Sequence, residues 1–329
     1  MGRTLKRRQA MQALTVAGAA LAMPAHAQAA YPNRPVKFVV PFPPGQAADI
    51  FARLIAERLG DQWKQQTIVD NKGGGAGIPG TESAKLAAPD GYTLLVATSG
   101  TFGVNPSLFP DLPYKPLVDF EPISLIFLVP LVIVAHPDFP ANSLDELIAL
   151  AKKNPGKYSY ASAGPGTSQH LSMELFKSKA GLDIVHVPYK GSGPAMADLL
   201  GGHVQLMMDS TASAQSAILD KRIKALGVTT ARRAPAPLDG IPSIGDTIVG
   251  YDTAGWAGLV APAKTPTDIV AKISADLQTQ LHDPAVVKSI EAKAGIAAPT
   301  TPTEFAAFIK KEIETWGAVV NATGTKPGN

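Results

Sequence analysis

Short apolar runs alternate with segments of helical periodicity from residue 36 onward, and this alternation indicates the fold class. The run at 36–40 predicts a buried strand, which the Pro- and Gly-rich segment 41–45 ends. Ile50, Leu54 and Leu59 then recur at helical spacing. The elements predicted next are a strand at 67–69, a helix near 82–87 and a strand at 92–97. Such strand–helix alternation is typical of a mostly parallel sheet with helices on both faces.

The same alternation returns farther along the chain and predicts a second α/β lobe. Ser143 followed by Glu146 has the capping-box spacing that begins a helix. The strands predicted in this part are 131–135, 158–161, 184–187, 204–208 and 224–228, and the helices are 143–150, 168–179, 195–200 and 213–219. A strand at 256–261 and amphipathic helices at 266–282 and 302–320 come last.

The length of 329 residues is enough for two domains. We expect a first lobe made of residues 28–132 plus 255–329, and a second lobe made of residues 133–254. The last two helices would then pack on the first lobe, and the chain would cross between the lobes twice.

The N-terminal residues have the pattern of a cleavable export signal. A basic segment at 3–8 precedes an apolar stretch at 10–23 and a small-x-small cleavage pattern at 25–27. The apolar stretch is shorter than the roughly 20 residues that span a bilayer. We therefore expect residues 1–27 to be removed during export by the Sec route, with the Arg7-Arg8 pair leaving the twin-arginine route open. A membrane anchor is the alternative, although a chain without cysteine has no lipid-anchoring lipobox and no disulfide.

Removal of that signal changes the charge balance of the chain. The full sequence has 30 Lys and Arg against 27 Asp and Glu. Four of the basic residues lie before position 28, so the remaining chain has 26 basic and 27 acidic residues and a net charge of about −1. This balance gives no indication of a basic face for nucleic acid.

The first candidate site is the junction at 43–49, where a strand ends and a helix begins. A helix N-terminus exposes backbone N–H groups and carries about half a positive charge, so it favours anions. Ligands of open α/β sheets bind beyond the carboxyl ends of the strands. The alternative is an ordinary turn with Asp49 in the first turn of the helix.

Two more junctions have similar chemistry. Residues 98–102 place hydroxyl and N–H groups at the same sheet edge, with a plain polar loop as the alternative. Residues 162–170 repeat the arrangement in the second lobe, where Gly164 and Gly166 allow a ligand to approach the backbone closely. Two such loops in opposed lobes would form a clamp. For His170 itself, a structural role is favoured over direct ligand contact.

Other site types have little support in the sequence. Residues 75–80 match G-x-G-x-x-G, but the run does not directly follow a strand and contains Pro79, so we interpret it as a loop. There is no cysteine nucleophile, no G-x-S-x-G and no H-E-x-x-H, and the six histidines lack metal-ligand spacing. Ser168, His170 and Asp209 could be imagined as a triad, but side chains two residues apart near a helix start point about 200° apart. We therefore expect a protein that is not an enzyme and needs no metal or other cofactor.

Five segments together resemble the Bug-type (tripartite tricarboxylate transporter) periplasmic solute-binding proteins, from about Tyr31 to the C-terminus. They are VVPFPPG at 39–45, DGYTLL at 90–95, NPSL at 105–108, VPYKG at 187–191 and DLLGG at 198–202. The resemblance implies an α/β, two-lobed periplasmic-binding-protein fold (Venus flytrap, type II). It also implies a monomer that binds an amino acid, a di- or tricarboxylate or an aromatic acid, and that passes it to transporter membrane subunits.

The resemblance further implies that the carboxylate is held mainly by backbone N–H groups and hydroxyls of the cleft loops. Carried over to this chain, the ligand-binding residues would be Phe42, Pro44, Gly45, Gln46, Ala47, Asp49, Ser99, Gly100, Thr101, Ala163, Gly164, Gly166, Thr167, Ser168, His170, Lys190, Gly191 and Asp209.

The sequence departs from the family pattern at three of these loops. Gln46 replaces a usual glycine, Pro165 a usual asparagine, and Asp209-Ser210 a usual Asp-Asn. Gln46 could fill space or bond a second polar group, which would suit a smaller ligand or one with an amide. A ligand-sensing component for a membrane receptor and an exported α/β hydrolase that depends on Ser168 are the alternative functions.

Overall fold

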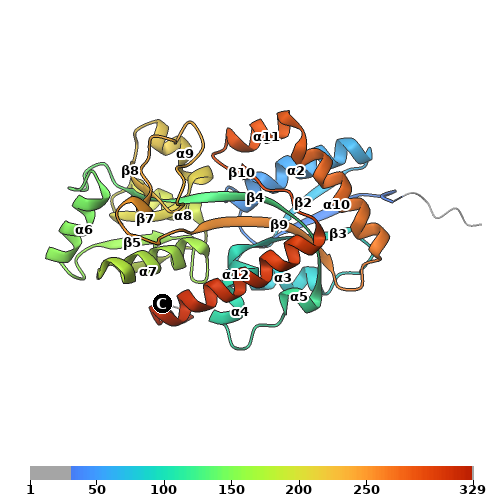
Figure 1. Ribbon diagram of the computed structural model, residues 1–329, viewed down its shortest axis with the longest axis horizontal. Helices are drawn as coiled ribbons and strands as arrows, with labels where there is room; N and C mark the ends of the chain where they lie inside the picture. Colours follow the sequence, from blue (N-terminus) through green and yellow to red (C-terminus); the bar gives the residue numbers. More distant parts are fainter. Residues whose placement is uncertain (1–30, 328–329) are drawn as a thin grey trace, which may run out of the picture. The chain divides into compact units, whose positions relative to one another are not determined.

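The computed structural model describes residues 31–327, so the predicted export signal at 1–27 lies outside the described residues. From Arg34 onward the chain forms a compact α/β unit. Its ten-stranded sheet has the order β2-β1-β3-β9-β4-β7-β5-β6, with β8 and β10 also paired to β4. Figure 1 shows helices on both sides of this sheet.

The strands are β1 (Val36–Val40), β2 (Thr67–Asn71), β3 (Thr93–Thr98), β4 (Phe120–Ala135), β5 (Ser159–Ser162), β6 (Val185–Pro188), β7 (Leu206–Ser210), β8 (Lys224–Val228), β9 (Ala254–Pro262) and β10 (Ile296–Ala297). The α-helices are α2 (Ala47–Trp63), α3 (Ile78–Lys85), α4 (Asn105–Leu108), α5 (Pro116–Asp119), α6 (Leu144–Lys153), α7 (Ser168–Ala180), α8 (Ser192–Leu200), α9 (Thr211–Leu219), α10 (Thr267–His282), α11 (Pro284–Glu291) and α12 (Pro302–Thr323). Shorter helical turns are η1 (Gly75–Gly77), η2 (Ser99–Val104) and η3 (Ile244–Asp246), of which η2 is a π-helix.

Parallel strands form the outer part of each half of the sheet. β1 pairs in parallel with β2 and β3, and β5 pairs in parallel with β6 and β7. In the first half, α2 buries Phe51, Ile55 and Leu59 completely, at the i, i+4, i+8 spacing of one helix face. Parallel strands place their carboxyl ends at one edge, so the helices that follow them begin close together.

β4 and β9 run antiparallel to their neighbours and connect the two halves (Figure 1). β4 pairs with β9 as far as Pro130, and from Leu131 to Ala135 it pairs with β7. Proline has no N–H to donate to a ladder, so Pro130 suits the point where the strand changes partners. The sequence predicted only residues 131–135 of this strand, because the strand continues through two prolines and through shifts of register that follow Pro122 and Leu125.

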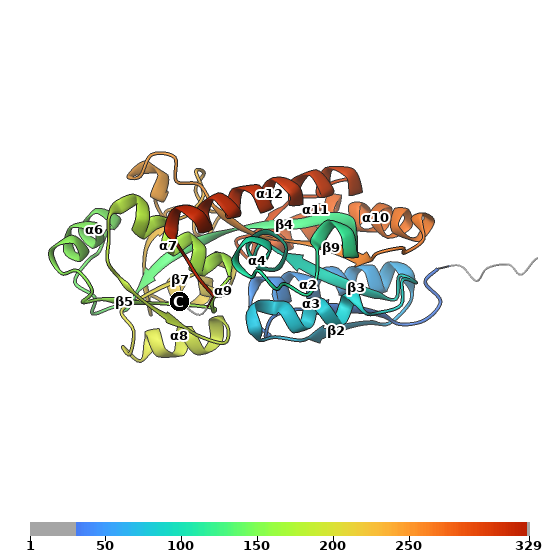
Figure 2. The same cartoon turned by 90° about the horizontal axis from the view of Figure 1, so that it is seen from below.

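The C-terminal helix α12 lies along β4 and extends from one half of the molecule to α7 in the other (Figures 1 and 2). Trp316 and Val320 of this helix form one buried cluster with Val104, Leu108 and Leu171. The cluster thus joins η2 and α4 of the first half to α7 of the second. α12 therefore contacts both halves of the molecule, in addition to the packing on the first lobe that the sequence predicted.

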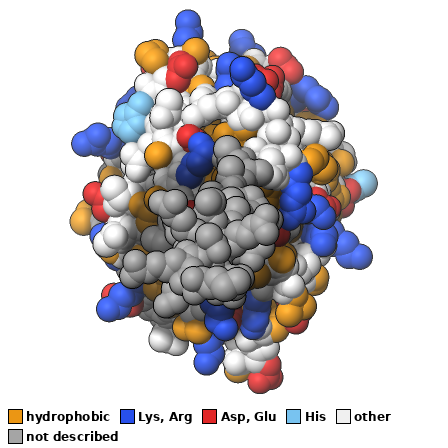
Figure 3. Space-filling model, turned by 90° about the vertical axis from the view of Figure 1, so that its right-hand side faces the viewer, with side chains coloured by type: hydrophobic (Ala, Val, Ile, Leu, Met, Phe, Trp, Pro, Cys, Tyr) orange, Lys and Arg blue, Asp and Glu red, His pale blue; other side chains and the backbone are white. Residues whose placement is uncertain are grey.

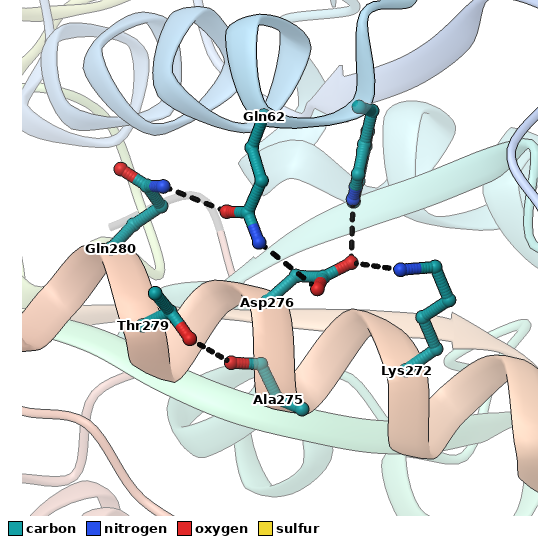
Figure 4. Close-up of polar contacts among 7 residues, drawn as sticks. Gln62, Lys272, Ala275, Asp276, Thr279 and Gln280 are labelled. Carbon is teal, nitrogen blue, oxygen red and sulfur yellow. Dashed lines mark hydrogen bonds and ion pairs between the residues drawn. The ribbon is translucent and has the colours of Figure 1, made fainter.

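Helices α2 and α10 are joined by a set of hydrogen bonds centred on Asp276 (Figure 4). The indole Nε1 of Trp63 donates to Asp276 Oδ2 at 2.6 Å, and Gln62 Nε2 donates to Oδ1 at 3.0 Å. Lys272 Nζ lies 2.9 Å from Oδ2, one helical turn away. Hydrogen bonds to a charged acceptor contribute more than neutral ones, so this carboxylate fixes the far end of α2 against the C-terminal helices.

The α/β class and the two-lobed arrangement predicted from the sequence are confirmed, and most of the predicted strands and helices are present within a few residues. The sequence analysis missed α11 and β10, and placed the start of α3 several residues too late. Basic and acidic side chains are interspersed on the face shown in Figure 3. No helix within residues 31–327 is long and apolar enough to cross a membrane.

Candidate functional site

Four helices begin at one cavity between the two halves of the molecule. α2, η2, α7 and α9 follow the strands β1, β3, β5 and β7, and the first residues of each contribute to its wall or border it. We call this space, of about 40 Å³ and partly open to solvent, the inner cavity. It is lined by Phe42, Gln46, Ala47, Ala48, Thr98, Ser99, Gly100, Phe127, Val129, Leu131, Thr167, Ser168, Gln169, Ser210, Gly255 and Trp256.

The inner cavity offers backbone dipoles in place of charged side chains: none of its described lining residues is Lys, Arg, Asp or Glu. The first N–H groups of a helix have no acceptor within the helix, and they carry the positive end of its dipole. At α2 the N-cap residue Gln46 makes no capping bond with its side chain. At α7 the Thr167 hydroxyl accepts only the N–H of His170, at 3.3 Å. The wall is thus suited to an anion that accepts several N–H bonds.

The floor of the inner cavity comes from the long strands β4 and β9. Phe127, Val129 and Leu131 of β4 face it, together with Gly255 and Trp256 of β9. The Trp256 indole Nε1 donates to Glu312 Oε2 of α12 at 2.6 Å.

The same carboxylate holds a second indole, since Trp316 Nε1 donates to Glu312 Oε2 at 2.9 Å. Burial raises the pKa of Glu312, although the bonds from Trp256 and Trp316 act in the opposite direction. Through Glu312 the position of α12 is coupled to that of the cavity floor. Sequence reasoning missed this floor, whose only signal is the long apolar run of β4.

Asp49, one of the sequence-predicted site residues, lies behind the first loop and does not line the inner cavity. Its carboxylate accepts the Gly45 N–H and the Asn71 side-chain amide, both at 2.9 Å, and pairs with Arg53 at 2.9 Å. Burial tends to raise its pKa, but the bonds from Arg53, Gly45 and Asn71 outweigh it and hold the pKa of Asp49 below its usual value. Asp49 thus fixes the loop that carries Gln46.

His170 has a similar supporting position in the second half. Its Nδ1 accepts the Gly166 N–H at 3.3 Å, and its ring stacks on His186 with centroids 4.2 Å apart. Burial lowers the pKa of His170 to about 3, and the charges of His186 and Lys177 act in the same direction. A neutral imidazole that accepts a backbone N–H orders the 163–167 loop from behind.

Asp209 is completely buried at the end of β7. Its Oδ1 accepts the Ser192 hydroxyl at 2.7 Å and the Ser210 N–H at 2.8 Å. Burial raises the pKa of Asp209 to about 6, although bonds from Ser192, Ser210 and Gln169 lower it. The carboxylate therefore joins the starts of α8 and α9 beneath the lining residues Gln169 and Ser210.

A second space of about 330 Å³ adjoins the inner cavity, and we call it the outer pocket. The two share Phe42 and Thr167 as walls. The remaining walls are Pro43, Gly74, Gly75, Ala76, Gly77, Ile78, Phe109, Ala163, Gly164, Pro165, Tyr189 and Lys190. The segment 74–78 overlaps the G-x-G-x-x-G match that was interpreted as a loop. At Gly77 (φ +77°) a Cβ would lie 2.7 Å from the Thr101 side chain, so only glycine suits this wall.

Loops of the two halves touch each other around these spaces. The Ser213 hydroxyl of α9 donates to the Gly45 carbonyl at 3.2 Å. A Cβ built on Gly100 would lie 3.1 Å from the Gly166 carbonyl oxygen. Contacts thus cross between the two halves, and the 43–49, 98–102 and 162–170 segments are brought together as the sequence analysis expected.

The sequence-predicted residues fall into three groups. Those that line the inner cavity are Phe42, Gln46, Ala47, Ser99, Gly100, Thr167 and Ser168. Those that line the outer pocket are Phe42, Ala163, Gly164, Thr167 and Lys190. Those that line neither and lie in or behind the same loops are Pro44, Gly45, Asp49, Thr101, Gly166, His170, Gly191 and Asp209.

The geometry gives no catalytic triad at Ser168. Its hydroxyl donates to Gln169 Oε1 at 3.3 Å, and His170 Nδ1 is engaged with the Gly166 N–H. Among residues 31–327, no three His, Asp or Glu side chains gather as potential metal ligands.

Comparisons with known proteins agree with this architecture. A model of the tripartite tricarboxylate transporter family receptor matches residues 51–325. The protein BugT of Bordetella pertussis is 36% identical over 315 residues, which cover 94% of this chain and 95% of BugT. A Rhodopseudomonas palustris protein solved with adipate superposes with a TM-score of 0.88 at 32% identity, covering 90% of this chain and 99% of the other.

A further solved structure is MatC from Rhodopseudomonas palustris, with bound malate. It has a TM-score of 0.82 and 31% identity, and the match covers 88% of this chain and 100% of MatC. Family model, relatives and solved structures agree over most of the chain. The chain therefore belongs to the tripartite tricarboxylate transporter receptor family and is a periplasmic solute-binding protein, not an enzyme.

Proposed function

We propose that this protein binds a small organic acid with its carboxylate in the inner cavity. The observation that carries the proposal is the convergence of α2 and α7, one from each half, on the same uncharged cavity. Their first-turn N–H groups and the hydroxyls of Ser99 and Ser168 would share the negative charge. The adipate and malate bound by two relatives support a carboxylate as the ligand class.

Closure of two lobes on the ligand is the second part of the proposal. The lobes are residues 28–132 plus 255–329, and residues 133–254, with the change of β4 partners at Pro130 near the division. Ligand binding would favour the closed arrangement, in which loops of both lobes complete the cavity. As a monomer, the closed protein would present a joint surface of the two lobes to the transporter membrane subunits, after residues 1–27 direct its export by the Sec or twin-arginine route.

A proline substitution tests the role of the helix N–H groups without removing a side chain. Proline is tolerated at the first position of a helix but has no N–H. Ala47 is the first residue of α2 and follows Gln46, whose ψ of 159° suits a residue before proline. A hydrogen bond to a charged group contributes about 1.5–3 kcal/mol, so Ala47→Pro should weaken carboxylate binding roughly tenfold or more.

The matched control is Thr267→Pro, at the exposed first position of α10 and away from the cavity. Calorimetric titration of the wild type and both variants with malate, succinate, adipate and benzoate measures the affinity for each acid. We expect Ala47→Pro to lose affinity and Thr267→Pro to keep it. The proposal is wrong if none of these acids binds the wild type, or if their uncharged amides bind equally well.

A further inference from the structure

The outer pocket has walls from both lobes and a mostly apolar surface. Phe42, Ile78 and Phe109 contribute apolar side chains from the first half, and Pro165 and Tyr189 contribute from the second. Its volume of about 330 Å³ lies at the lower end of the range of small-molecule sites. A short acid whose carboxylate lies in the inner cavity would leave this space to water.

Lys190 is the charged residue among the described residues that line the outer pocket. Its side chain is exposed, and its amino group forms no hydrogen bond or ion pair within residues 31–327. Tyr189 beside it has its hydroxyl engaged, since it donates to Asp198 at 2.6 Å. The mouth of the pocket therefore has a cation that is available to an anionic group.

Gln46 provides a second, independent indication of a ligand. Gln46 is only 5% exposed, and its buried Nε2 has no hydrogen-bond partner among the described residues. This nitrogen lies next to Gly191, where a built Cβ would be 3.2 Å from it and 3.2 Å from Pro43 Cγ. Gln46 lines the inner cavity and Pro43 the outer pocket, so the amide lies where the two spaces meet, next to Gly191, the residue that follows Lys190.

A buried donor without an acceptor costs about 1–3 kcal/mol, and an oxygen of the ligand would remove that cost. We infer that the ligand is an extended dicarboxylate, with four or more carbon atoms or an aromatic ring between its carboxylates. The first carboxylate lies in the inner cavity, the apolar body passes along Phe42, and the second carboxylate lies between Gln46 Nε2 and Lys190 Nζ. This inference rests on the proposed function, because the first carboxylate anchors the ligand.

Matched pairs of acids test the second carboxylate. Adipate and terephthalate carry it, hexanoate and benzoate lack it, and succinate is too short to reach it. Calorimetric titration of the wild type should give the tightest binding for adipate or terephthalate. In Lys190→Gln the affinity for adipate and terephthalate should fall roughly fivefold, because one partly exposed ion pair is lost. Hexanoate and benzoate should bind this variant as they bind the wild type.

Lys288→Gln, which changes an exposed lysine of α11 outside both spaces, is the matched control and should leave every affinity unchanged. Gln46→Leu should also weaken the two long diacids more than the monoacids. The inference is overturned if succinate binds tightest, or if Lys190→Gln has the same effect, or none, on diacids and monoacids. Failure of every acid to bind the wild type would instead refute the proposed function.

Discussion

Ser213 Oγ donates a hydrogen bond of 3.2 Å to the carbonyl oxygen of Gly45, and this bond joins α9 of one half to the loop before α2 in the other. A bond present only when the cleft is closed stabilises the closed state relative to the open state, and hence ligand binding. Ser213→Ala should therefore weaken binding two- to fivefold, the lower range for a partly exposed hydrogen bond. Titration calorimetry measures the loss. Ser216→Ala, at an exposed position on the same helix, should have no effect.

Gly100 and Gly166 give a second test of closure. A Cβ on Gly100 would lie 3.1 Å from the Gly166 carbonyl oxygen in the opposite loop. The larger side chain of Gly100→Val would hold the loops apart, and we expect at least a tenfold loss of affinity. Small-angle scattering with saturating ligand should show a larger radius of gyration than for the wild type. Gly193→Val, where a Cβ meets open space, is the control, and equal closure of both variants would contradict this role for Gly100.

The sequence predicted which loops lie close together because a strand followed by a helix fixes where the loop lies. The carboxyl ends of β1 and β3, and separately of β5 and β7, meet at one sheet edge whatever the details of packing. The sequence alone could thus group residues 43–49, 98–102 and 162–170. It could not distinguish Gln46, which lines the inner cavity, from Asp49, which lies behind it, because both are in or near the first turn of α2.

The cavity floor and the outer pocket were beyond sequence reasoning for a different reason. Gly255 and Trp256 reach the site through the pairing of β9 with β4, a contact between segments more than 100 residues apart. Local periodicity has no information on such a pairing. The sequence predicted a loop at 75–80, but Gly75–Gly77 form η1 and α3 begins at Ile78. The place of this segment against Phe109 and Pro165 depends on how the two halves meet.

His170 should make the stability of the protein depend on pH. Its pKa is lowered from 6.5 to about 3 in the folded protein, so the folded state favours the neutral ring more strongly than the unfolded state does. The resulting stability is fully present above about pH 6.5 and is lost as the pH falls toward 3. Its upper bound is on the order of 5 kcal/mol.

His170→Asn retains an acceptor for the Gly166 N–H but does not titrate. Denaturant unfolding of both proteins at several pH values between 4 and 7 measures the difference. We expect the wild type to lose stability relative to His170→Asn as the pH falls. Parallel curves for the two proteins would show that the imidazole is not held neutral.

Asp209 should make the stability of the protein depend on pH in the opposite direction to His170, within part of the same pH range. Burial raises its pKa from 3.8 to about 6, so the folded protein binds the proton more tightly than the unfolded chain. The associated stability is fully present below about pH 4 and is lost as the pH rises through 6, with a magnitude on the order of 3 kcal/mol. Asp209→Asn should therefore become more stable relative to the wild type as the pH rises from 4 to 7. Unfolding midpoints across this range measure the change. The prediction is contradicted if the wild type gains stability relative to Asp209→Asn as the pH rises. That result would mean that the hydrogen bonds from Ser192 and Ser210 lower the pKa of Asp209 by more than burial raises it.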